Sequence, residues 1–207
     1  MNVSEPLPLD APAEIEQASW ARLVSNLFSP PLVWAAAALP IALRDASTPQ
    51  QGVGWALVYI GLVCLLPLAF VAWMVQRGSI SDLHMQVRRE RLRPFVVSLL
   101  CALLAWWALG ALAAPPVMRL FALFSVVQIA IMAGVTLAWQ ISMHTMSISG
   151  SVVAAGAFFG AAPALAVLPL VLLVSAARLR LRRHTIAQVL AGAAVGVLVP
   201  VALFVTL

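Results

Sequence analysis

Seven apolar stretches, separated by short polar segments, fill most of this 207-residue chain and restrict the fold that it can adopt. Apolar residues make up 63% of the sequence and charged residues 9%, whereas soluble domains contain about 45–50% and about 25%. A spanning helix needs about 20 apolar residues, so this length allows at most about seven crossings with short loops. The composition excludes a soluble globule and predicts an all-α polytopic membrane bundle of six to seven spans.

The hydropathy pattern divides the chain into two parts. Residues 1–28 are predicted to form a polar, proline-rich tail and a short amphipathic helix at the membrane interface, because apolar residues recur there near helical spacing. Residues 29–207 are predicted to form the integral membrane domain. Its expected spans are residues 30–43, 53–75, 95–113, 116–139, 146–159, 164–177 and 185–207.

The segment from His144 to Ala177 is too long for one upright span. Its 34 residues would extend ~50 Å as a helix, whereas the hydrocarbon core is ~30 Å thick. Gly160 and Pro163 interrupt the segment near its middle. We therefore predict two short helices joined by a tight turn.

The basic residues of the chain are unusual, because all twelve are arginines and eight of them lie in two clusters, at residues 88–93 and 178–183. With seven crossings, ten arginines fall on the membrane face that also carries the N-terminus, and only Arg44 and Arg119 fall opposite. Basic loops are retained on the cytoplasmic side of a membrane and commonly contact lipid headgroups. We therefore expect this face to be cytoplasmic, in a plasma membrane of bacterial type.

Three polar segments that could carry chemistry meet at that face: Gln86 to Pro94, Gln140 to His144 and Arg178 to Gly192. Together they supply arginines, a serine and two histidines. Arginine and serine can stabilise the charge on phosphate oxygens during phosphoryl transfer. One neutral histidine can accept the phosphoryl group, and a protonated one can donate to the leaving oxygen.

The spacing of these segments resembles the type 2 phosphatidic acid phosphatase superfamily, whose pattern is K-x6-R-P, then P-S-G-H, then S-R-x5-H-x3-D. The resemblance covers about residues 77–200, and its third element is the most specific. Six residues match: Arg93 and Pro94 in the first element, Ser142 and His144 in the second, and Arg178 and His184, at the family's spacing, in the third.

The resemblance implies an all-helical membrane phosphatase that requires no metal or other cofactor. By position, it makes His184 the nucleophile and His144 the general acid. It also implies that Arg93, Arg178 and Ser142 hold the phosphate.

Five positions depart from the family's pattern. Gln188 can hydrogen-bond the ring of His184 but supplies no charge, and Met143 places a bulky side chain where glycine permits close approach to phosphate. Arg88 or Arg89 could replace the missing lysine from the same loop. The departures are Gln86 for lysine, Ile141 for proline, Met143 for glycine, Ala177 for serine and Gln188 for aspartate.

These observations predict a membrane phosphatase or phosphotransferase acting on a lipid-soluble phosphate or diphosphate, of the phosphatidate or prenyl diphosphate class. The alternative is a non-catalytic lipid-phosphate-binding or assembly subunit that retains the phosphatase fold. An aromatic prenyltransferase would need acidic clusters for magnesium diphosphate, and the three aspartates of this chain are widely separated. The expected partners are the membrane and a lipid-linked phosphate, with no nucleic acid, and the oligomeric state stays open.

Overall fold

The computed structural model describes residues 12–80 and 88–206, except for the side chains of residues 12–18, 88 and 89. Within these ranges the chain is helical and contains no strand. The elements are α1 (Pro12–Leu27), α2 (Pro30–Arg44), α3 (Pro49–Tyr59), the π-helix η1 (Ile60–Leu65), α4 (Leu66–Gln76), the 3-10 turn η2 (Arg88–Arg91), α5 (Leu92–Ala111), α6 (Pro116–Ala138), α7 (Met143–Phe159), α8 (Ala161–Arg180) and α9 (Ile186–Thr206).

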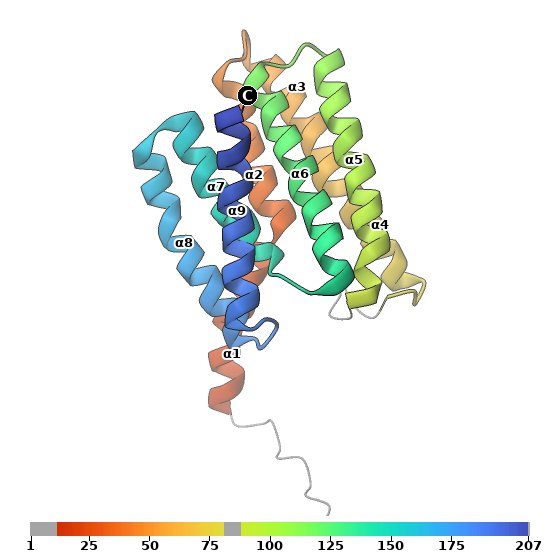
Figure 1. The fold of residues 1–207 in the computed structure, drawn as a ribbon, viewed down its shortest axis with the longest axis vertical. Coiled ribbons are helices and arrows are strands. Elements are labelled where there is room, and N and C mark those ends of the chain that lie inside the picture. The colour runs from red at the N-terminus through yellow and green to blue at the C-terminus, as the bar shows by residue number, and fades with distance from the viewer. Residues whose placement is uncertain (1–11, 81–87, 207) are drawn as a thin grey trace, which may run out of the picture.

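The helices from α2 to α9 stand side by side as one bundle, and α1 extends from one end of it (Figure 1). The segments α3, η1 and α4 follow one another as a single span, Pro49–Gln76. The end of α4, the start of α5, the end of α6, the end of α8 and the start of α9 lie at the end of the bundle next to α1. We call this end the α1 end. The described parts of the three polar segments therefore share one face, as the hydropathy pattern predicts.

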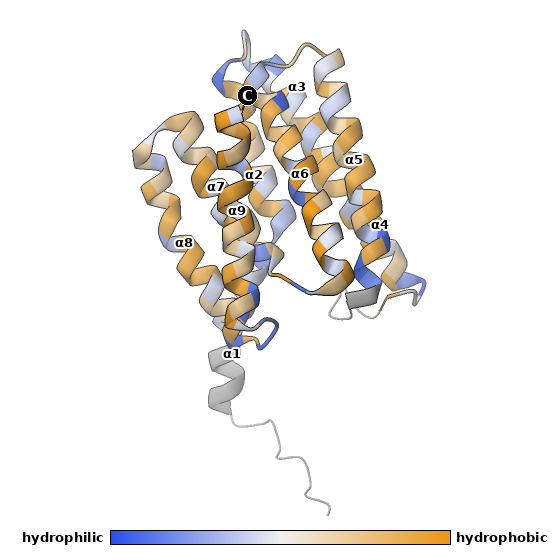
Figure 2. Ribbon diagram, in the orientation of Figure 1, coloured by the Kyte–Doolittle hydropathy of each residue, from blue (hydrophilic) through white to orange (hydrophobic). Residues whose placement is uncertain are grey.

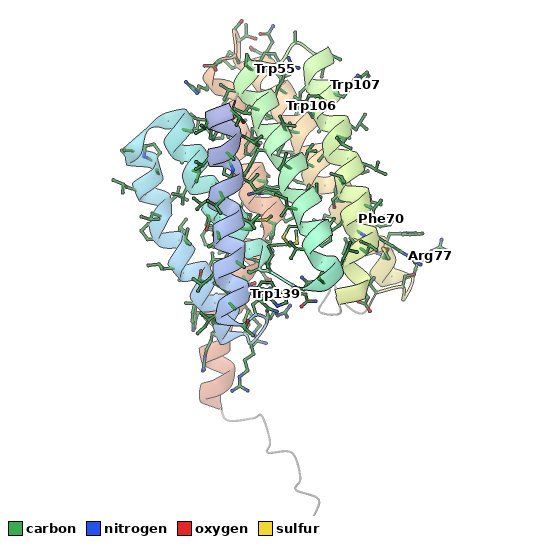
Figure 3. All side chains as sticks on the ribbon, viewed as in Figure 1. Trp55, Phe70, Arg77, Trp106, Trp107 and Trp139 are labelled. Atoms are coloured by element: carbon green, nitrogen blue, oxygen red, sulfur yellow. The ribbon has the colours of Figure 1, made fainter. Side chains whose placement is uncertain are left out.

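The helices are apolar along most of their length, and hydrophilic residues gather toward the ends of the bundle (Figure 2). In the part of the chain that the structure describes, five helices are long and apolar enough to cross a membrane: Pro49–Gln76, Leu92–Ala111, Pro116–Ala138, Ala161–Arg180 and Ile186–Thr206. The prediction of an all-α polytopic membrane bundle is confirmed. Trp55, Trp106 and Trp107 lie toward the end opposite α1, and Trp139 lies toward the α1 end (Figure 3), as expected for indoles at headgroup level.

Two of the seven predicted spans are shorter than a full crossing. Helix α2 has 15 residues, and it follows Ser19–Leu27 of α1 across a 44° bend. Helix α7 has 17 residues and is apolar. Because proline has no backbone N–H and fits the first turn of a helix, Pro30 and Pro31 set the start of α2 immediately after the bend.

The predicted break between residues 144 and 177 is confirmed, because α7 and α8 are separate helices joined at Gly160. Gly160 has a φ of +94°, which side chains with a Cβ rarely adopt. This turn sends α8 back alongside α7 and returns the chain to the α1 end (Figure 1).

Two glycines of α9 allow that helix to lie directly against α7. A Cβ on Gly192 would collide with the carbonyl oxygen of Ser142, and a Cβ on Gly196 would collide with that of Met146. Small residues permit such close backbone approach between membrane helices. The contact fixes the start of α7 next to the start of α9.

We expect Gly192→Ala to lower the stability of the protein by about 1–3 kcal/mol, because backbone atoms must move to admit the methyl group. Thermal unfolding in detergent would measure the change. Gly134→Ala in α6 is the matched control, since nothing lies within 4 Å of its Cβ position. Equal unfolding midpoints for the two variants would contradict the close α7–α9 contact.

Candidate functional site

A cavity of about 440 Å³ extends into the bundle from the α1 end. Both candidate histidines, His144 and His184, line it, and so do Arg91 and Arg178. None of the described residues that line the cavity is acidic. The remaining wall is mostly apolar and comes from α2, η1, α4 and α5, for example from Trp34, Val63, Pro67 and Phe95.

His184 lies in the turn between α8 and α9 and is 8% exposed. Its Nδ1 atom is 3.2 Å from Oε1 of Gln188, and the same oxygen accepts the backbone N–H of Thr185 at 3.1 Å. Because that N–H can only donate, the Gln188 atom is the amide oxygen. His184 therefore donates from Nδ1 and carries its lone pair on Nε2.

The sequence Thr185-Ile-Ala-Gln188 explains why Gln188 stands at this position. The Gln188 backbone N–H donates to the Thr185 hydroxyl at 3.4 Å, while the Gln188 side chain accepts the Thr185 backbone N–H. This reciprocal pair is a capping box at the start of a helix. Gln188 thus caps α9 and orients the ring of His184 with the same oxygen.

His184 is held in its neutral form. Burial lowers its pKa to about 4, and the nearby positive charge of Arg178 adds to this effect. Arg91 and Arg183 lower the pKa further, whereas the hydrogen bond to Gln188 raises it. At neutral pH the ring is therefore an uncharged base with an available lone pair.

His144 and Arg178 share a partner that the sequence analysis did not identify. Arg178, 4% exposed, donates from Nη1 to the hydroxyl of Ser25 at 2.7 Å. The Nε2 atom of His144 donates to the backbone carbonyl of Ser25 at 3.1 Å and lies 3.4 Å from the Ser25 hydroxyl. Helix α1 is therefore part of the site.

The spacing of small residues on α1 could have identified Ser25 as a buried residue. Ala21 and Ser25 are buried, whereas the apolar Leu23 and Leu27 are exposed. The fully buried residues of α1 are thus small and four positions apart, whereas Leu23 and Leu27 face outward. An amphipathic pattern based on large residues alone identifies the opposite face of the helix.

Two predicted phosphate-holding residues lie away from the cavity wall. Ser142 is fully buried and caps α7, where its hydroxyl accepts the backbone N–H of Thr145 at 3.4 Å. Arg93 is exposed on α5, and the neighbouring Arg91 lines the cavity in its place. The structure therefore brings His144, Arg178 and His184 together, with Arg91 as a further cation that the motif spacing missed.

Other predicted positions are placed as follows. Met143 is half-buried and lines the cavity beside His144. Gln86 and the side chain of Arg89 lie outside the described residues. Within the described part of the chain, no group of three or more His, Cys, Asp and Glu residues could hold a metal ion.

No family model, curated protein or solved structure matches the chain. The fold and the site define its class, a helical membrane protein with a basic, histidine-containing cavity open at one end of the bundle. Fold alone does not establish an activity, so the function is inferred from the chemistry of the cavity.

We expect Arg178→Met to raise the pKa of His184 toward its ordinary value, because the substitution removes the positive charge that lowers this pKa most. NMR titration of histidine-labelled protein would measure it, and only three histidines need assignment. Arg180→Met, on the exposed side of the same helix, is the control and should leave the titration unchanged. A His184 pKa that stays the same in Arg178→Met would contradict the electrostatic coupling.

Proposed function

We propose that the protein is a membrane phosphatase or phosphotransferase that acts on a lipid-soluble phosphate or diphosphate through a phosphohistidine at His184. One observation carries the proposal. Two imidazoles and two buried guanidinium groups, from Arg91 and Arg178, line a single cavity whose other walls are apolar. This combination suits an amphiphile with an anionic head.

The buried positive charge of Arg178 supports the binding of an anionic ligand. The Nε atom of Arg178 is buried and has no hydrogen-bond partner among the described residues. Leaving a buried charged group with incomplete hydrogen bonding is costly, and a phosphate supplies both charge and acceptor oxygens. Arginine is well suited to this role because its planar fork matches phosphate geometry.

The apolar walls support a lipid-soluble substrate. Leu32 of α2, Leu65 of η1 and Leu68 of α4 line the cavity and are also exposed on the outside of the bundle. These leucines therefore mark a side of the cavity that faces the bilayer. A hydrocarbon chain can extend through this side while the phosphate lies against the arginines.

The proposed reaction has two steps. The Nε2 lone pair of His184 attacks phosphorus, the bond to the leaving oxygen breaks, and that oxygen takes a proton from protonated His144. Water then attacks the phosphohistidine and gives its proton to neutral His144. The N–P bond breaks, its electron pair returns to Nε2, and inorganic phosphate leaves. Arg91 and Arg178 stabilise the equatorial oxygens in both steps.

We propose a cytoplasmic location for the site, because basic residues concentrate at the α1 end and positive loops are retained on that side. The C-terminal end of α9 lies at the opposite end of the bundle (Figure 1). The proposed membrane is a plasma membrane of bacterial type. The reaction needs no cofactor and no nucleic acid, because protein groups supply the nucleophile, acid and cations.

We expect the purified protein to release phosphate from phosphatidate or a prenyl diphosphate in detergent without added metal. His184→Ala should lower kcat by about 10³-fold or more, since the nucleophile is lost. Substrate with a radioactive phosphoryl group should label the wild type at a phosphoryl group that is acid-labile and base-stable. The variant His184→Ala should not be labelled. Arg182→Ala, at an exposed position in the same turn, is the control for folding and charge. Equal activity in wild type and His184→Ala would refute the proposal.

We expect His144→Ala to slow hydrolysis of an alkyl phosphate much more than hydrolysis of an aryl phosphate. An aryl oxide leaves without protonation, so it depends less on the general acid, which typically contributes about 10²–10⁴-fold. Steady-state rates with both substrates would measure the difference. An equal loss of rate with both substrates would show that His144 is not the general acid.

A second candidate function is non-catalytic binding of a lipid phosphate. Gln188 supplies no negative charge to His184, and the lowered pKa of that ring reduces its basicity. A less basic imidazole is a weaker nucleophile, whereas binding by the arginines is unaffected. Tight binding of a lipid phosphate with no turnover and no phosphoenzyme would favour this function.

A further inference from the structure

We infer that Ser25 of helix α1 is a positioning residue of this site, which holds the Arg178 guanidinium and the His144 ring in the orientations that they present to the cavity. The catalytic role of these two groups rests on the proposed function, whereas the hydrogen bonds to Ser25 are independent of it.

Ser25 stands behind the cavity wall. It is 2% exposed and does not line the cavity, whereas both of its partners do. The adjacent Asn26 and the nearby Ser29 also line the cavity, so the chain reaches the wall immediately after Ser25. This placement favours support of the two side chains from the rear over competition with a ligand.

The two hydrogen bonds fix different properties. The Ser25 carbonyl can only accept, so it requires a proton on Nε2 of His144 at 3.1 Å, and such a contact sets both the tautomer and the plane of a histidine ring. The Ser25 hydroxyl accepts from Nη1 of Arg178 at 2.7 Å. It thereby limits the movement of a long side chain that would otherwise retain rotamer freedom.

The path of the chain explains how an interfacial helix reaches the site. Ala21 and Ser25 lie one helical turn apart and are both buried, and α1 packs against α8. The 44° bend before α2 then redirects the chain into the bundle.

The test compares Ser25→Ala with Ser25→Thr, which keeps the hydroxyl. Ser19→Ala, at an exposed position of the same helix, is the control. The first measurement is the pKa of His184 by NMR titration, which needs no activity. Arg178, Arg91 and Arg183 are the charged groups that act on this ring. If Ser25 holds Arg178 near His184, Ser25→Ala raises that pKa, while Ser25→Thr and Ser19→Ala leave it at the wild-type value.

The second measurement is the affinity for inorganic phosphate, read from the shift of the thermal unfolding midpoint. We expect Ser25→Ala to bind phosphate about tenfold more weakly, the usual effect of losing a hydrogen bond to a charged group. Ser25→Thr should bind within about twofold of wild type.

The outcomes separate this inference from the proposed function. A His184 pKa that is the same in wild type, Ser25→Ala and Ser19→Ala overturns the positioning role, whatever the enzyme activity. A raised pKa in Ser25→Ala, restored in Ser25→Thr, supports it, even if the wild type neither binds phosphate nor turns over a lipid phosphate. In that last case only the proposed function fails.

Discussion

Burial of positive charge beside two imidazoles, at one end of an apolar bundle, is the constraint on which the site depends. Arg91 and Arg178 are buried, and the cavity that they line contains no acidic residue among those described. Burial lowers the pKa of His184, and the charge of these arginines lowers it further and makes the cavity attractive to an anion. In a membrane protein such an arrangement is costly, and it therefore indicates function more strongly than any single residue of the motif.

The fold could be predicted from the sequence because hydropathy and helix-breaking residues determine it directly. Apolar runs mark the spans, Pro30 and Pro31 set the start of α2, and Gly160 divides α7 from α8. The first and last residues of each helix were harder to predict from the sequence, because the length of a helix that is barely long enough to cross the membrane depends on its packing. Helix α2, for example, is only 15 residues long and continues from α1 across a bend.

Site residues could be predicted only where their spacing along one helix or turn determines how their side chains lie relative to one another. Arg178 and His184 belong to one such segment, and the structure brings both to the cavity. Arg91 ends η2 and Arg93 is the second residue of α5, and this difference of two positions directs one side chain inward and the other outward. Ser25 could not be found by spacing, because it is 119 residues from His144 and 153 from Arg178.

The π-helix η1 has a consequence for the apolar part of the cavity wall. A π-helical turn contains one residue more than an α-helical turn, which rotates the following residues by about 100°. Before it, Tyr59 is fully buried and stacks on Phe121 at 4.9 Å; within and after it, Val63, Cys64 and Pro67 border the cavity. One continuous span therefore contributes to the packed interior before η1 and to the cavity wall within and after it. Its first half places Tyr59 in the interior of the bundle, and its second half forms part of the wall of the cavity.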